Sequence, residues 1–226
     1  MDVVAIANAL AHVPIFAPLG EGDRRALASR LRAHRYAPNE IVFHRGDPGT
    51  HLYILVAGTV KIALPDEYGH EAVVALLRGG DVFGDLAVFD DSPRSATVVA
   101  VTESVCLLLA REDFLAVLER SPAAMRETLR ILAKTIRRST NRVEDLVFLD
   151  VPSRVAKCLL DLADLGGTPV TEISMTQDDL AAMVGATRVS VNRVLAGLES
   201  RGIVGIGRRR IEIKDRDKLA GEVHHQ

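Results

Sequence analysis

The sequence predicts an α+β chain built from an N-terminal β jelly roll, a long helix and a C-terminal winged helix-turn-helix. Short β segments separated by turn residues fill much of the first half. A helix with apolar residues at heptad spacing follows, and a capped helix-turn-helix pattern lies near the C-terminus. The expected domains span residues 1–121, 122–149 and 150–226. A chain of 226 residues can give both globular parts a core of their own.

The N-terminal part changes its pattern after residue 36. Residues 2–35 are expected to form short helices, broken at Pro14, Pro18 and Gly20. From Ala37 to Ala110 the pattern predicts short strands. Examples are Glu40–His44, Leu52–Val56, Thr59–Leu64, Ala72–Leu77, Ala96–Ala100 and Val105–Leu109. Turns that contain glycine and proline separate these strands, which is typical of a sandwich or jelly roll.

The segment from Ala123 to Phe148 is predicted to be one long helix. Its apolar residues keep the 4-3 spacing of a dimer seam. They are Met125, Leu129, Leu132, Ile136, Val143 and Leu146. Ser139, beside Thr140, is the polar interruption of this stripe, and a helix that packs on its own domain is the alternative. The helix is expected to end at Asp150-Val151-Pro152, which marks the domain boundary.

The segment from Thr176 to Leu198 has the pattern of a helix-turn-helix. Thr176 and Asp179 have the spacing of a capping box. Gly185 permits the left-handed conformation of a tight turn, and Thr187 can cap the second helix. Two short strands, Ile203–Ile206 and Arg210–Ile213, are expected to form a β wing after the motif.

The second helix of this motif has an apolar inner face and a different outer face. The inner residues are Val191, Val194, Leu195 and Leu198. Val189, Arg193 and Ala196 lie on the opposite side, and Arg188 lies in the first turn. A helix of this kind fits the major groove of DNA, whereas an ordinary helical hairpin is the alternative. The pattern therefore predicts a DNA-reading domain.

Charge and cysteine content limit the class of protein further. The whole chain has a net charge of −2, but residues 176–214 carry +3 and the rest −5, which suits a basic reading surface on an acidic body. Cys106 and Cys158 are the two cysteines, and we expect free thiols in a reducing cytoplasm. They are too few for an iron–sulfur centre, which needs about four thiolates. Neither a secretory signal nor a membrane span is expected.

The stretch FGDLAVFDDSPRSATV, from Phe83 to Val98, predicts an anion site. Gly84 permits a tight turn into a short helix at Asp85-Leu86-Ala87, whose free N–H groups can face an anion. Arg94 offers a guanidinium for a phosphate, Ser95 adds a hydroxyl, and the Asp85 carboxylate can accept a sugar hydroxyl. A plain salt bridge between Asp85 and Arg94 is the alternative.

Taken in order, these motifs resemble the cyclic-AMP receptor protein / fumarate–nitrate regulator superfamily of bacterial transcription factors. The resemblance covers essentially the whole chain and includes RGDPGTHLYILVAGTVKI, FGDLAVF…RSATV and FLDVPSRVAKCLL. It implies a sensor jelly roll of the cyclic-nucleotide-binding kind, a dimerisation helix and a winged helix-turn-helix.

The resemblance also assigns roles to individual residues. It implies that Gly84, Asp85 and Leu86 form the phosphate-binding cassette, that Arg94 and Ser95 hold the cyclic phosphate, and that Ser139 and Thr140 meet the adenine amino group. Cyclic AMP is the first expected effector, with cyclic GMP next, and no tightly bound cofactor is expected. Two departures weaken the match: Asp85 replaces the usual glutamate, and the connection to Arg94 is one residue shorter than in the enteric cyclic-AMP receptor.

The recognition helix departs from the family pattern as well. Regulators that read TGTGA-type half-sites carry Arg-Glu-x-x-x-Arg, whereas this chain has Val189 between Arg188 and Arg193. The segment TRVSVNR is similar to the cyanobacterial nitrogen-control regulators, which favour GTA…TAC palindromes and sense 2-oxoglutarate. We expect Arg188 and Arg193 each to contact a guanine and Val189 to tolerate A·T. The remaining expected DNA-binding residues are Thr176 and, as phosphate contacts, Thr187, Ser190, Asn192, Arg208, Arg209 and Arg210.

The resulting expectation is a homodimeric, ligand-responsive regulator that binds a palindromic operator in double-stranded DNA and contacts RNA polymerase. A regulator of the same fold that is ligand-independent, or that responds to a 2-oxoacid or a cyclic dinucleotide, remains open. A metal-dependent cupin-type enzyme is a remote alternative, because His44, His51 and His70 lack metal-ligand spacing. A haem-based gas sensor is another. We expect no catalytic residue and no metal site.

Overall fold

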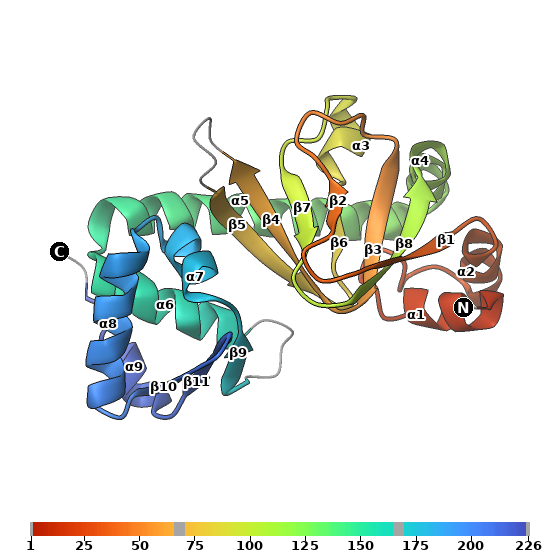
Figure 1. Ribbon diagram of the computed structural model, residues 1–226. Helices are drawn as coiled ribbons and strands as arrows, with labels where there is room; N and C mark the ends of the chain where they lie inside the picture. Colours follow the sequence, from red (N-terminus) through yellow and green to blue (C-terminus); the bar gives the residue numbers. More distant parts are fainter. Residues whose placement is uncertain (1, 66–70, 165–169, 225–226) are drawn as a thin grey trace. The chain divides into compact units, whose positions relative to one another are not determined.

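A computed structural model describes residues 2–65, 71–164 and 170–224. Two compact units divide the chain, and the main boundary between them falls after Thr135, inside the long helix α5 (Pro122–Phe148). The N-terminal unit is rich in strands, and the C-terminal unit combines helices with a small sheet (Figure 1). This is the expected α+β organisation.

Two four-stranded sheets form the N-terminal unit. One sheet has the order β1 (Arg32–Tyr36), β8 (Ser104–Ala110), β3 (His51–Ala57) and β6 (Val82–Phe83). The other has the order β2 (Ile41–Phe43), β7 (Thr97–Ala100), β4 (Thr59–Pro65) and β5 (Glu71–Arg78). Neighbours in the first sheet, and β2 and β4 with β7 in the second, pair antiparallel. The sandwich predicted from the short strands is confirmed.

Strand β3 lies in the middle of this unit and is buried on both faces. Leu52 and Ile54 belong to a core shared with helices α1 (Val3–Leu10), α2 (Glu21–Ala28) and α4 (Arg111–Arg120). Tyr53 and Leu55 belong to the second core, which contains residues of both sheets. Successive side chains of a strand point to opposite faces, so each of these pairs fills one core.

The N-terminal prediction is correct for two elements and wrong for a third. Helices α1 and α2 form, but Arg32–Tyr36 is strand β1 rather than the end of a helical region. Its backbone pairs with β8 from Arg32 opposite Leu108 to Tyr36 opposite Ser104. Only Tyr36 is buried in β1, so the segment lacks the alternation of apolar and polar residues from which a strand can be predicted.

Helix α5 keeps its apolar stripe uncovered. Ala124 and Thr128, near its start, are buried. The side chains of Leu129, Ile136 and Val143 are 57%, 66% and 63% exposed. These three residues of the stripe are therefore not packed on the helix's own domain, whereas Leu132 is partly buried. Soluble proteins rarely leave a row of large apolar side chains uncovered unless another surface meets it.

The C-terminal unit has a three-stranded sheet in the order β10, β11, β9. Its elements are α6 (Val151–Ala163), β9 (Glu172–Ser174), α7 (Gln177–Val184), α8 (Arg188–Ser200), β10 (Val204–Gly207), β11 (Arg210–Ile213) and α9 (Arg216–Ala220). The β wing forms as predicted, with its first strand one residue later. The Asp150 side chain accepts a hydrogen bond from the Ser153 backbone N–H and caps α6, which confirms a helix break there. Strand β9 and helix α9 were not predicted.

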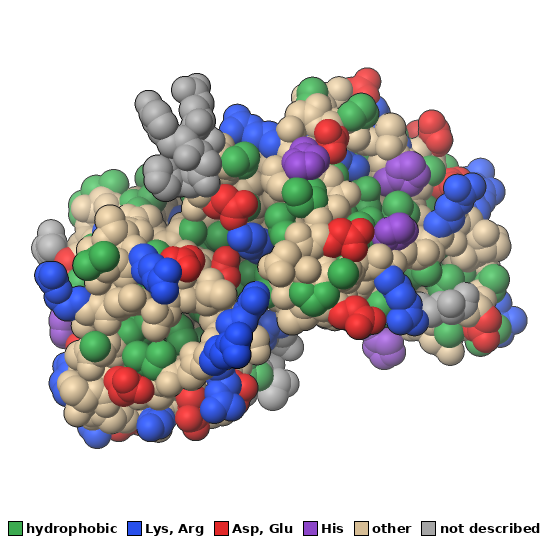
Figure 2. All heavy atoms as spheres, in the orientation of Figure 1, with side chains coloured by type: hydrophobic (Ala, Val, Ile, Leu, Met, Phe, Trp, Pro, Cys, Tyr) green, Lys and Arg blue, Asp and Glu red, His purple; other side chains and the backbone are tan. Residues whose placement is uncertain are grey.

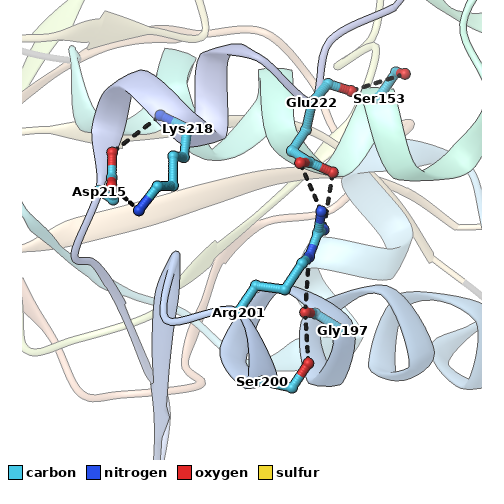
Figure 3. Close-up of polar contacts among 7 residues, drawn as sticks. All are labelled: Ser153, Gly197, Ser200, Arg201, Asp215, Lys218 and Glu222. Atoms are coloured by element: carbon cyan, nitrogen blue, oxygen red, sulfur yellow. Dashed lines mark hydrogen bonds and ion pairs between the residues drawn. The ribbon is translucent and has the colours of Figure 1, made fainter.

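The end of the chain ties two helices of this unit together (Figure 3). The guanidinium of Arg201, after α8, donates two hydrogen bonds of 2.8 and 2.9 Å to the Glu222 carboxylate. The Ser153 hydroxyl, in α6, donates to the Glu222 carbonyl at 3.2 Å. This bidentate pair and the buried Ser153 hold the first turn of α6 near the end of α8.

Candidate functional site

Gly84 lies where strand β6 turns into the short helix α3 (Leu86–Asp90). Its φ of +76° is in the left-handed region, which glycine adopts without strain. A Cβ at this position would lie 2.7 Å from Nη1 of Arg94. The turn and the arginine therefore both require glycine here.

Arg94 is the buried cation of the cassette. Its side chain is only 4% exposed. Nη1 donates to the Gly84 carbonyl and Nη2 to the His51 carbonyl, each at 2.6 Å. The guanidinium carbon lies 4.4 Å from the Phe43 ring centroid and 5.5 Å from that of Tyr53. Backbone carbonyls and aromatic faces thus hold the guanidinium in place.

The charge of Arg94 has no acidic partner in this site. Among the described residues, no carboxylate lies within ion-pair distance of the guanidinium, and buried Nε has no hydrogen-bond acceptor. Burial lowers the pKa of the guanidinium, and interactions with Tyr53 and then with the charges of Asp47 and Asp85 oppose that shift. The plain salt bridge between Asp85 and Arg94 is therefore wrong. A buried cation with unused donors is what an anion requires from its binding site.

Asp85 occupies the N-cap position of α3, beside this arginine. Burial raises the pKa of its carboxyl above the ordinary value, and the backbone N–H groups of Asp85 and Leu86 and the charge of Arg94 oppose that rise. An ionised carboxylate held in such a place is an acceptor that can be satisfied by a ligand hydroxyl.

The other two predicted cassette residues are exposed. Leu86 is 49% exposed, and Ser95 is exposed next to the buried Arg94. Both thus lie at the surface. The structure brings Gly84, Asp85 and Arg94 together as predicted.

Sequence reasoning missed the residues that frame the cassette. Phe43, His51 and Tyr53 contact Arg94 from strands β2 and β3. At Gly49, a Cβ would lie 2.3 Å from the Ala87 Cβ, so the loop before β3 can approach α3 only with glycine. Glycine in RGDPGT was a visible signal, whereas nothing marked the aromatic residues as neighbours of Arg94.

Ser139 and Thr140 lie on the exposed part of α5. The Thr140 hydroxyl donates to the Ile136 carbonyl at 3.1 Å, one turn back along the helix. This part of α5 belongs to the C-terminal unit, whereas the cassette belongs to the N-terminal unit. The predicted contribution of both hydroxyls to effector binding remains a prediction.

The helix-turn-helix forms as its sequence predicts. The capping box is present: the Thr176 hydroxyl accepts from the Asp179 N–H at 3.0 Å, and the Asp179 carboxylate accepts from the Thr176 N–H at 3.3 Å. Gly185 ends α7 with φ +63°, and the Thr187 hydroxyl caps α8 by accepting from the Ser190 N–H at 3.2 Å. Local capping therefore sets both ends of the turn.

The two faces of α8 are separated as expected. Val191, Leu195 and Leu198 are buried, and Val194 is partly buried. The exposed residues are Arg188, Val189, Arg193 and Ala196. Ser190 and Asn192 are partly exposed, and the buried Oδ1 of Asn192 has no hydrogen-bond donor among the described residues.

The wing places further arginines on the same unit. Arg208, Arg209 and Arg210 are exposed at the turn between β10 and β11. A notch of about 310 Å³ lies between this wing and the start of α7 and α8, lined by Thr176, Asp178, Arg188, Arg209 and Arg210 among others. Figure 2 shows basic side chains gathered over the wing with acidic side chains close to them.

Two family models match the chain in the order of its units. Residues 33–121 match the cyclic nucleotide-binding domain, and residues 153–222 match the Crp-like helix-turn-helix domain. A CRP-like cAMP-activated global transcriptional regulator of Mycobacterium tuberculosis is 35% identical, over 93% of this chain and 96% of the relative. The chain belongs to the CRP/FNR family of transcription regulators.

Two further proteins are similar to this chain, one in sequence and one in fold. The cyclic AMP receptor protein of Thermus thermophilus is 32% identical, over 89% of this chain and 93% of the relative. The structure of the c-di-GMP responsive global regulator CLP of Xanthomonas campestris superposes with a TM-score of 0.74 at 22% identity, over 86% of this chain and 99% of that one. At that identity the second similarity concerns the fold alone.

For this CRP/FNR regulator, family membership settles the class of activity. It is a non-enzymatic transcription regulator with a DNA-binding helix-turn-helix and a domain of the cyclic-nucleotide-binding kind. The cupin-type enzyme is therefore wrong. Within the described ranges, the structure has no cluster of three or more His, Cys, Asp or Glu residues suited to a metal, and no helix long and apolar enough to cross a membrane.

Proposed function

We propose that this chain is a homodimeric transcription regulator whose binding to a palindromic operator is controlled by a cyclic nucleotide, with cyclic AMP as the effector. The observation that supports it best is Arg94: a buried guanidinium with no carboxylate partner among the described residues and an Nε without an acceptor. A buried charge without a counter-charge is costly, and the phosphate of a nucleotide supplies one.

The neighbours of Arg94 favour a nucleotide over a simple anion. The Asp85 carboxylate offers an acceptor for a ribose hydroxyl, and Ser95 offers a hydroxyl for the phosphate. The M. tuberculosis relative is cAMP-activated by name, which favours the cyclic nucleotide. Aspartate in place of the family's glutamate shortens the reach toward the ribose by one methylene group.

Dimerisation is the second part of the proposal. Leu129, Ile136 and Val143 form the uncovered stripe of α5, and a second copy of the same helix would cover it. Ser139 and Thr140 lie in that helix, where we propose that they contact the base of the effector. Effector binding at this helix would favour the form of the dimer in which the two copies of α5 pair, since a ligand shifts an equilibrium toward the state that it binds more tightly.

DNA reading is the third part. We propose that Arg188 and Arg193 contact guanines, that Val189 accepts A·T, and that the two recognition helices of the dimer lie about 34 Å apart, one turn of DNA. Thr176, Thr187, Ser190 and Asn192, with the wing arginines Arg208, Arg209 and Arg210, would contact the DNA backbone. RNA polymerase is the further proposed partner.

A ligand-independent regulator is the second candidate, and one observation favours it. The Gly84 and His51 carbonyls already accept hydrogen bonds from both Nη atoms of Arg94. Because these carbonyls accept hydrogen bonds from both Nη atoms, the Nη atoms need no bound anion as an acceptor. The unused Nε is the reason to prefer an effector.

Isothermal titration of the purified protein with cyclic AMP, and with cyclic GMP for comparison, tests the proposal. We expect saturable cyclic AMP binding that the Arg94→Leu variant loses and the Ser92→Ala variant retains. Ser92 is exposed in the same loop, so it controls for loop damage. Circular dichroism checks that each variant is folded. Absence of heat with both nucleotides, from folded wild-type protein, would overturn the cyclic-nucleotide effector and favour the second candidate.

A further inference from the structure

The two arginines on the outer face of the recognition helix have different surroundings. Nη1 of Arg188 lies 3.3 Å from a carboxylate oxygen of Asp178, across the turn between α7 and α8. Arg193 has no ion-pair partner among the described residues. Of these two candidates for base contact, Arg188 is therefore the one already paired with a carboxylate.

This pair has no evident role in holding the fold. The side chains of Arg188 and Asp178 are 61% and 63% exposed, and ion pairs at such positions contribute little to stability. The cap of α7 is made by Thr176 and Asp179, not by Asp178. The carboxylate of Asp178 can thus be removed without removing the cap.

The location of Asp178 is unexpected for a DNA-binding surface. It lines the notch of about 310 Å³ together with Arg188, Arg209 and Arg210. A carboxylate repels DNA phosphates, so it weakens sequence-independent attraction at this place. The same carboxylate restrains the long Arg188 side chain, whose free rotation would otherwise let it reach a phosphate instead of a base.

We propose that Asp178 is a positioning residue for base reading: it holds Arg188 for the edge of a guanine and disfavours its use as a general phosphate contact. The wing has a similar arrangement, since Nη1 of Arg210 lies 3.3 Å from the Glu172 carboxylate. Arg208 and Arg209 have no ion-pair partner among the described residues. Asp178 therefore distinguishes Arg188, which reads a base, from Arg208 and Arg209, which attract the backbone.

This inference rests on the proposed operator binding, and selection of half-sites from randomised duplex DNA tests both. The wild type, Asp178→Asn and Arg188→Ala are compared, with cyclic AMP and without it. We expect the wild type to prefer one guanine about tenfold or more over other bases. Arg188→Ala identifies that guanine by losing the preference. Asp178→Asn should reduce the preference at the same base pair at least threefold and leave the other positions unchanged.

Two matched variants separate positioning from a general effect of charge. Asp217→Asn removes the same charge from an exposed position in α9 and should keep the wild-type pattern. Asp178→Glu keeps the carboxylate and should restore most of the preference. On random DNA, Asp178→Asn should bind several-fold more tightly, with a salt dependence steeper by about 0.9 for one added phosphate contact.

The outcomes are distinguishable. If the wild type selects no sequence in either condition, the operator proposal fails and this one fails with it. If the wild type selects a half-site and Asp178→Asn selects it with the same preference at the Arg188 position, only the role of Asp178 is overturned. A loss of preference spread over every position, or shared by Asp217→Asn, would overturn it too.

Discussion

Gly84 and Arg94 determine each other's geometry. The Gly84 carbonyl accepts a hydrogen bond of 2.6 Å from Nη1 of Arg94, and the same nitrogen would lie 2.7 Å from a Cβ at position 84. Gly84 therefore anchors the guanidinium, and it can do so only because it has no side chain. The anion site depends on this contact between residues ten positions apart.

Gly84→Ala should destabilise the N-terminal unit and weaken cyclic AMP binding. The substitution forces alanine to φ +76° and displaces the Arg94 guanidinium. We expect a loss of about 2 kcal/mol in the free energy of unfolding, measured by urea titration. Gly80→Ala is the matched control, since it has φ +98° and open space around the added Cβ. Equal losses in the two variants would contradict the role of Arg94.

Asp85→Asn should stabilise the ligand-free protein at neutral pH while weakening cyclic AMP binding. Burial raises the pKa of the Asp85 carboxyl in the folded state. Above that pKa the carboxylate is charged in both states, and the folded state bears the cost of burial. As pH falls through the folded pKa, the folded state takes up a proton first and gains stability.

Unfolding of the wild type and Asp85→Asn at several pH values measures this effect. The stabilisation by asparagine should be largest at neutral pH and shrink as pH falls through the raised pKa. Lower stability of Asp85→Asn at neutral pH would show that the ionised carboxylate supports the fold. Asp90→Asn, at an exposed position of α3, is the control.

Ile136→Glu should separate the proposed dimer. Ile136 lies in the middle of the uncovered stripe with 66% of its side chain exposed, so the monomer tolerates the change. Pairing would bury two carboxylates and should weaken the dimer about 100-fold or more. Sedimentation at several protein concentrations measures it, with Lys134→Glu on the other side of the helix as control. A monomeric wild type, or an unchanged dimer in Ile136→Glu, contradicts this seam.

Val189→Glu should change the base preference without harming the fold. Val189 is 69% exposed on the outer face of α8, and glutamate there could accept a hydrogen bond from a cytosine amino group. We expect selected half-sites to gain a C·G pair next to the base read by Arg188. Ala196→Glu adds the same charge farther along the helix and should give no such gain. Weaker binding with an unchanged base preference would place Val189 away from the bases.

The sequence alone was sufficient for the helix-turn-helix. Its boundaries depend on Thr176, Asp179, Gly185 and Thr187, and each of these acts on backbone groups within a few residues. Interactions of such short range can be recognised along the chain. Most strands of the N-terminal unit, the long helix and its apolar stripe were predictable for the same reason, because periodicity is a local property.

Only the tertiary structure decided which groups surround the Arg94 guanidinium. The sequence pattern left open a salt bridge with Asp85, but strands β2 and β3 bring Phe43, Tyr53 and the His51 carbonyl to the guanidinium instead. Strand β1 could not be predicted for a related reason. Its pairing with β8 joins residues about seventy positions apart, and only Tyr36 is buried. Likewise, the contact of Asp178 with Arg188 exists because the turn at Gly185 folds α7 back against α8. Contacts between distant residues depend on packing, and packing is a property of the whole fold rather than of any segment.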